Sequence, residues 1–183
     1  IIAQGWLALQ LTGSPFWVGV AAGARGVGIL CSGALGGTIA DRVDRRKLLI
    51  SVQLVGMTIA FTMSFLAATG LVRIWHLLIM AWVQGASLGF IMPARNSLVY
   101  DLVGRENLLS GMAANYWGMN LMRVIGPSAG GIILAKAGVS GCYLFMGASY
   151  GVGILALTLV PRRDGVKTHQ GSLWQDLREG LRF

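Results

Sequence analysis

Apolar and small residues fill six stretches of this chain, and short polar runs separate them. The first stretch is short, 1–11, and the others cover 16–38, 48–69, 74–100, 108–134 and 142–160. Apart from the first, each is close to the roughly 20 residues with which a helix crosses about 30 Å of hydrocarbon. The pattern predicts an all-α membrane protein, a transmembrane helical bundle over 1–160 whose first span is incomplete. Because the chain opens without methionine inside an apolar segment, we expect it to be part of a longer protein.

Beyond residue 160 the apolar pattern stops. Residues 161–183 are polar, and near their end Leu173, Trp174, Leu177 and Leu181 have the spacing of one face of an amphipathic helix. We therefore expect this segment to lie outside the hydrocarbon.

The charged residues, only 12% of the chain, gather in the connections between spans. The side of the bundle that holds residues 39–47, 101–107 and 161–183 carries ten of the 15 Lys and Arg, and the other side has only Arg73 and Lys136. By the positive-inside rule these three segments are expected to be cytoplasmic. This bunching also explains the net charge of +8 without nucleic acid as a partner, and the membrane lipid is the expected surroundings.

Small residues recur four positions apart in several spans, a spacing that lets membrane helices pack closely. The pairs are Gly19 and Gly23, Gly85 and Gly89, Gly126 and Gly130, and Gly147 and Gly151. The two cysteines, Cys31 and Cys142, are expected near opposite membrane faces, too far apart for a disulfide, so both should be free thiols.

The connection between the second and third spans holds the most specific motif. It contains Gly37, an Ala-Asp-Arg step ending in Asp41 and Arg42, and the basic run Arg45, Arg46 and Lys47. This run resembles motif A of the major facilitator superfamily, except that Asp44 stands where the family usually has glycine. The resemblance implies a cytoplasmic gate in which close helix approach at Gly37 and breakable ion pairs of Asp41 and the arginines hold the bundle closed. The alternative is ordinary positive-inside loop charge.

The fifth span contains a second motif, Gly126, Pro127, Gly130 and Gly131. It is similar to the core of the superfamily's motif C, which is associated with exporters, although Met122 replaces a further glycine. The alternative is an ordinary proline kink with small neighbours. Together the motifs imply the N-terminal six-helix half of a major facilitator fold from the drug and siderophore (enterobactin-type) exporter branch, in a bacterial inner membrane. Residues 161–183 would then link to a missing C-terminal half.

Arg25 in the second span and Arg123 near the middle of the fifth are arginines that cannot be assigned to a connection. A guanidinium at such depth needs water or a partner. Helical spacing places Tyr116, Asn120 and Arg123 on one stripe with Asn115 beside it. We expect these five residues to face a substrate cavity; the alternative is an arginine satisfied by carbonyl groups or by a carboxylate of the missing half. Because the spans hold no carboxylate, such a cavity favours anionic or strongly polar substrates.

The sequence thus predicts a secondary active transporter that works by alternating access and exports a small anionic or amphipathic molecule, with the proton as counter-ion. The alternative is a membrane sensor or scaffold built on a transporter fold. A membrane enzyme is disfavoured because the spans contain no paired carboxylates or Ser/His arrangement. His76 and His169 stand alone, so we expect no metal site and no cofactor.

Overall fold

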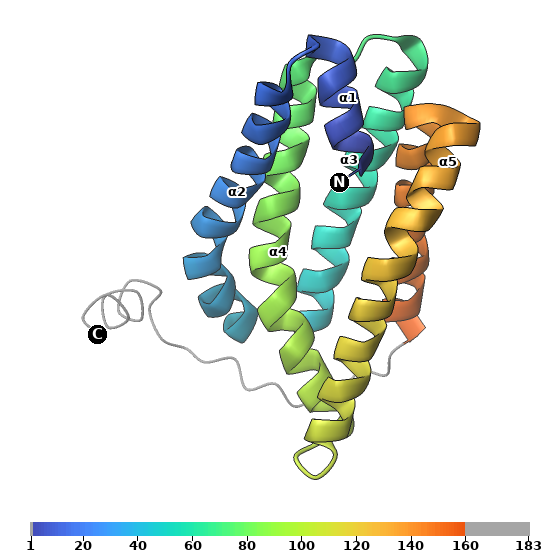
Figure 1. The fold of residues 1–183 in the computed structure, drawn as a ribbon. Helices are drawn as coiled ribbons and strands as arrows, with labels where there is room; N and C mark the ends of the chain where they lie inside the picture. The colour runs from blue at the N-terminus through green and yellow to red at the C-terminus, as the bar shows by residue number, and fades with distance from the viewer. Residues whose placement is uncertain (1, 160–183) are drawn as a thin grey trace.

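The computed structural model describes residues 2–159, including the side chains of residues 3–33 and 43–159. This part of the chain is all-α, as the apolar pattern predicts, and it contains no strand. The expected linker, 161–183, lies outside the described residues. The helices are α1 (Ile2–Thr12), α2 (Pro15–Arg42), α3 (Arg45–Thr69), α4 (Ile74–Val103) and α5 (Leu108–Leu159), and they run up and down in one bundle (Figure 1).

Within the described residues four helices, α2 to α5, are long and apolar enough to cross a membrane. α1 has 11 residues and a length of about 16 Å, roughly half the hydrocarbon thickness. Many large apolar side chains on the outside of the bundle are exposed, for example Leu30, Phe65 and Leu159. Such surfaces suit contact with lipid or with further membrane helices.

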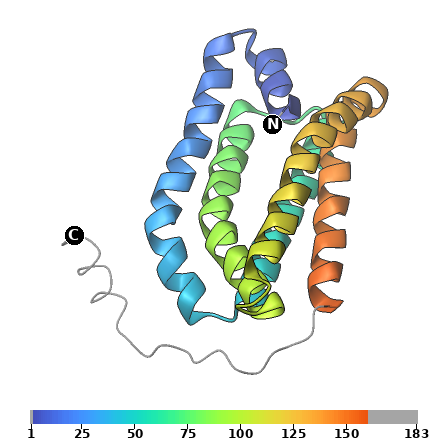
Figure 2. The same cartoon turned by 60° about the horizontal axis from the view of Figure 1, so that its bottom comes forward.

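α5 is a helical hairpin, because its backbone leaves the helical region at Gly138, where φ is 66° and ψ is −167°. Glycine adopts a positive φ without strain, whereas other residues do so only with strain. The chain can therefore reverse its direction at this one residue. We call Leu108–Ala137 the first limb and Val139–Leu159 the second limb. Figures 1 and 2 show the first limb, yellow to orange, and the second, orange to red, running in opposite directions. The 52 residues of α5 therefore provide two crossings.

α2 and α4 pack most closely, and glycines make their approach possible. A Cβ atom built on Gly85 would overlap the carbonyl oxygen of Arg25, and one built on Gly89 would overlap the hydroxyl of Ser32. Across the same contact, a Cβ on Gly28 would overlap the carbonyl of Trp82. The predicted close-packing role of Gly85 and Gly89 is thus confirmed, while the sequence missed their partner on α2.

α3 packs mainly against α5. Ser64 Oγ donates to the carbonyl of Ser140 at 2.9 Å, and Ser140 Oγ donates to the carbonyl of Ser64 at 3.0 Å. This reciprocal pair fixes α3 beside the start of the second limb. The adjoining core contains residues from every helix: Leu7, Ala8, Ala21, Met63, Val72, Leu77, Met80 and Tyr143.

The helices continue past the apolar stretches, so the connections expected at 39–47 and 101–107 are shorter than predicted. α2 reaches Arg42 and α3 begins at Arg45, which leaves Val43 and Asp44 between them. α4 includes Asp101 and ends at Val103, because the φ of 74° at the following residue, Gly104, interrupts the helix. Polar residues end the apolar part of a helix at the membrane surface, whereas the backbone hydrogen bonds continue in water, so a helix can be longer than the predicted span.

Candidate functional site

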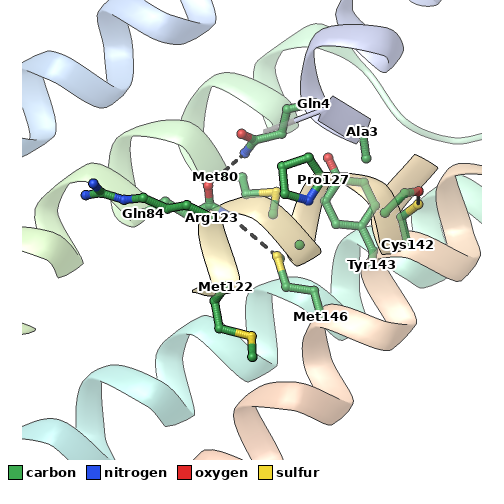
Figure 3. A pocket seen from close by; sticks show the side chains of 12 residues that line it. Ala3, Gln4, Met80, Gln84, Met122, Arg123, Pro127, Cys142, Tyr143 and Met146 are labelled. Carbon is green, nitrogen blue, oxygen red and sulfur yellow. Dashed lines mark hydrogen bonds between the residues drawn. The ribbon is translucent and has the colours of Figure 1, made fainter. Parts of the chain in front are cut away.

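A cavity of about 420 Å³ opens between α1, α4 and the two limbs of α5 (Figure 3). Small residues of α1 and α5 leave the space open, since a Cβ on Gly126 or Gly130 would meet no atom within 4 Å. The size falls in the range of pockets that hold small molecules, roughly 300–1,000 Å³. The lining residues are Ala3, Gln4, Met80, Gln84, Met122, Arg123, Gly126, Pro127, Gly130, Cys142, Tyr143 and Met146.

Two glutamines cross one wall of the cavity. Gln4 Nε2 on α1 donates to Gln84 Oε1 on α4 at 3.0 Å. Gln84 Nε2 in turn donates to the Sδ atom of Met146 at 3.8 Å, and Figure 3 shows both bonds as dashed lines. A thioether is a weak acceptor, so the amide N–H group of Gln84 remains available to a better one.

Arg123 supplies the positive charge of the cavity. Its guanidinium has no hydrogen bond or ion pair with any residue in the described part of the chain, and no carboxylate lines the cavity. An arginine at this depth in a span is costly unless it meets water or an anion. A molecule in the cavity therefore meets a guanidinium whose charge no described residue neutralises.

Tyr143 is a second unused donor. Only 2% of the residue is exposed, and its hydroxyl has no hydrogen-bond partner among the described residues. Leaving a buried hydroxyl unpaired costs about 1–3 kcal/mol. The hydroxyl oxygen is fully enclosed by protein atoms, so it is not open to the cavity.

The rest of the lining is apolar and adaptable. Met80 is buried at 1% exposure, Met146 is half-buried, and Met122 is exposed on the open side. Methionine side chains are flexible and polarizable, and they contact aromatic rings favourably. The cavity thus combines a few hydrogen-bond donors with a lining of flexible apolar side chains.

A second polar group lies at the start of α3, away from the cavity. Arg45 Nη1 forms an ion pair with Asp101 Oδ2 on α4, and it lies 3.5 Å from the carbonyl oxygen of Ser97. Arg46 Nη2 donates to the carbonyl of Thr158 at 2.6 Å. These contacts tie the start of α3 to α4 and to the end of the second limb of α5.

The local geometry explains how Asp44 can stand where motif A usually has glycine. Its φ of −52° is accessible to any residue, and its carboxylate accepts hydrogen bonds from the backbone N–H groups of Arg46 at 3.0 Å and Lys47 at 3.3 Å. It is therefore the N-cap of α3, and a cap of this kind contributes about 1 kcal/mol.

Comparison with known families identifies the chain. Residues 1–183 match the transmembrane secretion effector family. The chain belongs to this family of the major facilitator superfamily. The match confirms the resemblance that motifs A and C carry in the sequence.

Relatives in this family are named as exporters. The chain is 31% identical over 161 residues to the enterobactin exporter EntS of Salmonella choleraesuis strain SC-B67, covering 84% of the chain and 37% of that protein. It is 28% identical over 194 residues to the multidrug efflux pump Tap of Mycobacterium bovis strain BCG, covering 100% of the chain and 46% of that protein. The chain thus spans less than half the length of these curated relatives. No solved structure matches it significantly.

The structure separates the residues that the sequence predicts to face a substrate cavity. Arg123 lines the cavity, but Arg25, Asn115, Tyr116 and Asn120 do not. Tyr116 and Asn120 are exposed on the first limb, and Asn115 Nδ2 is buried without a hydrogen-bond partner among the described residues. These four residues stay predictions that depend on surfaces outside this part of the chain.

The structure places the fifth-span motif at the cavity and describes the side chains of the gate motif only in part. Gly126, Pro127 and Gly130 line the cavity, and Gly131 follows on the exposed face of the first limb. For the gate motif, Gly37, Asp41 and Arg42 belong to the last turns of α2, and their side chains lie outside the described residues. Arg45 and Arg46 have the partners described above.

Sequence reasoning missed Gln4 and Tyr143 at the cavity and Asp101 at the partner position of Arg45. A signal was present for Gln4 and Gln84, because an amide within an apolar span must find a partner in the bundle. Tyr143 gave none, since a tyrosine near a span end more often marks the membrane interface.

Proposed function

We propose that this chain forms part of a secondary active transporter that exports a small anionic or amphipathic molecule across the bacterial inner membrane by alternating access. The observation that carries the proposal is the cavity between α1, α4 and α5, with Arg123 unneutralised in its wall. The printed names of the relatives, an exporter and an efflux pump, support export.

An anion is favoured by the balance of charge at the cavity. Its lining contains one cation, Arg123, and no carboxylate, so a cationic substrate would be repelled and an anionic one attracted. In the described residues the acidic side chains, those of Asp44, Asp101 and Glu106, all lie near the opposite ends of the helices. They cannot neutralise the guanidinium within the bundle.

The start of α3 is proposed as a cytoplasmic gate. The Arg45 to Asp101 pair is partly buried, with 20% and 28% of the two side chains exposed, and such pairs can break and re-form in water as helices move. Asp41 and Arg42, in the adjoining turn of α2, would complete the gate. Gly37 would allow close approach of a neighbouring helix.

Alternating access requires a second set of six spans against which this bundle rocks, and we propose that a C-terminal half supplies it. Proton exchange is the proposed energy source. Because no carboxylate lines the cavity, the proton carrier would belong to the second half or to the gate itself.

Flux through the full-length protein tests the proposal. The purified transporter is reconstituted in proteoliposomes, a pH gradient is imposed, and uptake of an aromatic sulfonate is measured, since a sulfonate stays ionised and does not leak through lipid. Arg123→Ala should lower the initial rate about tenfold or more, and Arg123→Lys should lower it less. Arg105→Ala, in the exposed turn after α4, is the matched control.

Unchanged flux in both Arg123 variants would overturn the assignment of the anion site. A wild-type protein that binds the sulfonate but never moves it, with or without a gradient, would favour a sensor or scaffold over a transporter. Loss of uptake when a protonophore collapses the gradient is expected for proton exchange.

A further inference from the structure

We infer that Gln4 and Gln84 form a reversible pair of amides, which lets the cavity bind either a hydrogen-bond donor or a hydrogen-bond acceptor of a substrate. This inference rests on the proposed function, because it takes the cavity as the substrate site. It adds Gln4, Gln84 and Met146 as residues that determine specificity, beside the charge of Arg123.

The pair joins two helices within the lining of the cavity. Gln4 on α1 donates through Nε2 to Oε1 of Gln84 on α4 at 3.0 Å. Both side chains line the cavity, and Figure 3 shows this bond as a dashed line among the lining residues. An amide has an oxygen that accepts and a nitrogen that donates. Whichever glutamine supplies the N–H group, the other must therefore supply the oxygen.

The amide oxygen of Gln4 is open in the observed orientation. Oε1 of Gln4 accepts no hydrogen bond from any described residue. The described side-chain atoms that are both enclosed and unpaired belong to Arg45, Asn115 and Tyr143, and Gln4 is not among them. Its oxygen therefore keeps surface that a small molecule can reach, although only 7% of the residue is exposed. In this orientation the pair presents an acceptor to a hydroxyl or N–H group of a ligand.

The opposite orientation costs little, because the other end of the pair is held weakly. Nε2 of Gln84 donates to Sδ of Met146 at 3.8 Å, and a thioether is a weak acceptor. The oxygen and nitrogen of an amide are similar in size, so turning both amides by half a rotation preserves their packing. Gln84 would then donate to Gln4, and the N–H group of Gln4 would take the place of its oxygen. The hydrogen bond lost in the exchange is the weak one to sulfur.

The two orientations thus present opposite groups at the same place. A ligand shifts such a balance by the difference between its affinities for the two states, and the weak bond to Met146 is a small difference to overcome. The expected substrates are acids that also carry a neutral polar group. That group can be a donor, such as an amine, or an acceptor, such as a carbonyl.

Two matched pairs of aryl sulfonates test the inference by calorimetric titration of the full-length protein in detergent. 4-Acetylbenzenesulfonate has an acceptor, and its 4-isopropenyl analogue has the same shape without one. 4-Aminobenzenesulfonate has a donor where 4-methylbenzenesulfonate has a methyl group. Gln4→Met, which removes the amide and keeps a similar length, should weaken binding of the acetyl and amino ligands about three- to tenfold. It should leave their two apolar counterparts unchanged.

Met146→Leu tests the reversal itself. Leucine keeps a similar volume and removes the sulfur acceptor, so the observed orientation loses its bond and the reversed one becomes relatively more favourable. The affinity for the acetyl ligand relative to the amino ligand should rise about threefold. Met92→Leu is the matched control, because Met92 is an exposed methionine of α4 that does not line the cavity. It should leave this ratio unchanged.

The inference is overturned if Gln4→Met weakens polar and apolar ligands alike, if it affects only one of the two polar ligands, or if Met146→Leu leaves their ratio unchanged. Sulfonate flux measured on the same preparation keeps the outcomes apart. Flux that depends on Arg123 while these titrations fail would leave the transporter in place and remove only the reversible pair.

Discussion

The guanidinium of Arg45, in the first turn of α3, forms an ion pair with the carboxylate of Asp101 in the last turn of α4. The two residues are 56 positions apart in the chain, and their contact joins two helices at the end where the gate is proposed. The Nε atom of Arg45 is also buried without a hydrogen-bond partner among the described residues. The pair therefore has a direct structural role that can be measured.

A double-mutant cycle measures that role. Arg45→Gln and Asp101→Asn should each lower the stability of the full-length protein in detergent, and the double variant should lose less than the sum. The expected coupling is about 1 kcal/mol, because the pair is partly exposed and its attraction is screened. Thermal unfolding at low salt gives the value. Arg105→Gln combined with Asp101→Asn is the control pair, and strict additivity for Arg45 would contradict the assignment.

Gly85 should be intolerant of a single methyl group. Gly85→Ala would place a Cβ on the carbonyl oxygen of Arg25, so α2 and α4 would have to separate, at a cost of about 1–3 kcal/mol. Gly126→Ala, in another membrane helix, meets no atom within 4 Å and should keep or slightly raise stability. Unfolding temperatures of the two variants provide the comparison, and equal losses would show that α2 and α4 do not pack as described.

Cys142 should report occupancy of the cavity. It lines the cavity, and its Sγ atom lies 3.6 Å from the carbonyl oxygen of Gly130, whereas Cys31 is exposed on α2. A bound ligand at ten times its Kd should slow alkylation of Cys142 by a small membrane-permeant maleimide about tenfold, since only the empty fraction reacts. Mass spectrometry follows both thiols in one sample. Equal protection of Cys31 would point to a global change instead of occupancy.

The orientation of the bundle can be read from two exposed turn residues. Val43, between α2 and α3, is 40% exposed, and Leu71, between α3 and α4, is 62% exposed. In a protein with both native cysteines replaced by serine, Val43→Cys should react with an impermeant reagent only from the cytoplasm. Leu71→Cys should react only from outside, as the distribution of Lys and Arg requires. The reverse pattern would remove the gate from the cytoplasmic side.

The sequence predicted the features that depend on chemistry within one helix. The apolar stretches indicate an all-α membrane protein, and the spacing of Gly85 and Gly89 indicates a close contact. Contacts between helices distant in the chain could not be predicted. Asp101 is a polar residue at a helix end like several others, and only the packing of α3 against α4 makes it the partner of Arg45.

The cavity between α1, α4 and α5 shows the same division between what one helix determines and what the packing of helices determines. Arg123 could be predicted, because a guanidinium in a span has few acceptable surroundings. Its neighbours could not, since Tyr116 and Asn120, on the same helical stripe, are exposed about two turns and one turn before Arg123, while Gln4, Gln84 and Tyr143 come from other segments. Which face of the first limb meets the cavity depends on how the hairpin of α5 is set against α1 and α4.

The reversal at Gly138 also fixes how the two limbs of α5 are offset along the cavity. Arg123 and Tyr143 belong to the two limbs of a single hairpin, so their offset along the membrane normal depends on the pairing of those limbs and not on the position of α1 or α4. If the bundle rocks as a body, the entrance would widen and narrow while this internal length is conserved.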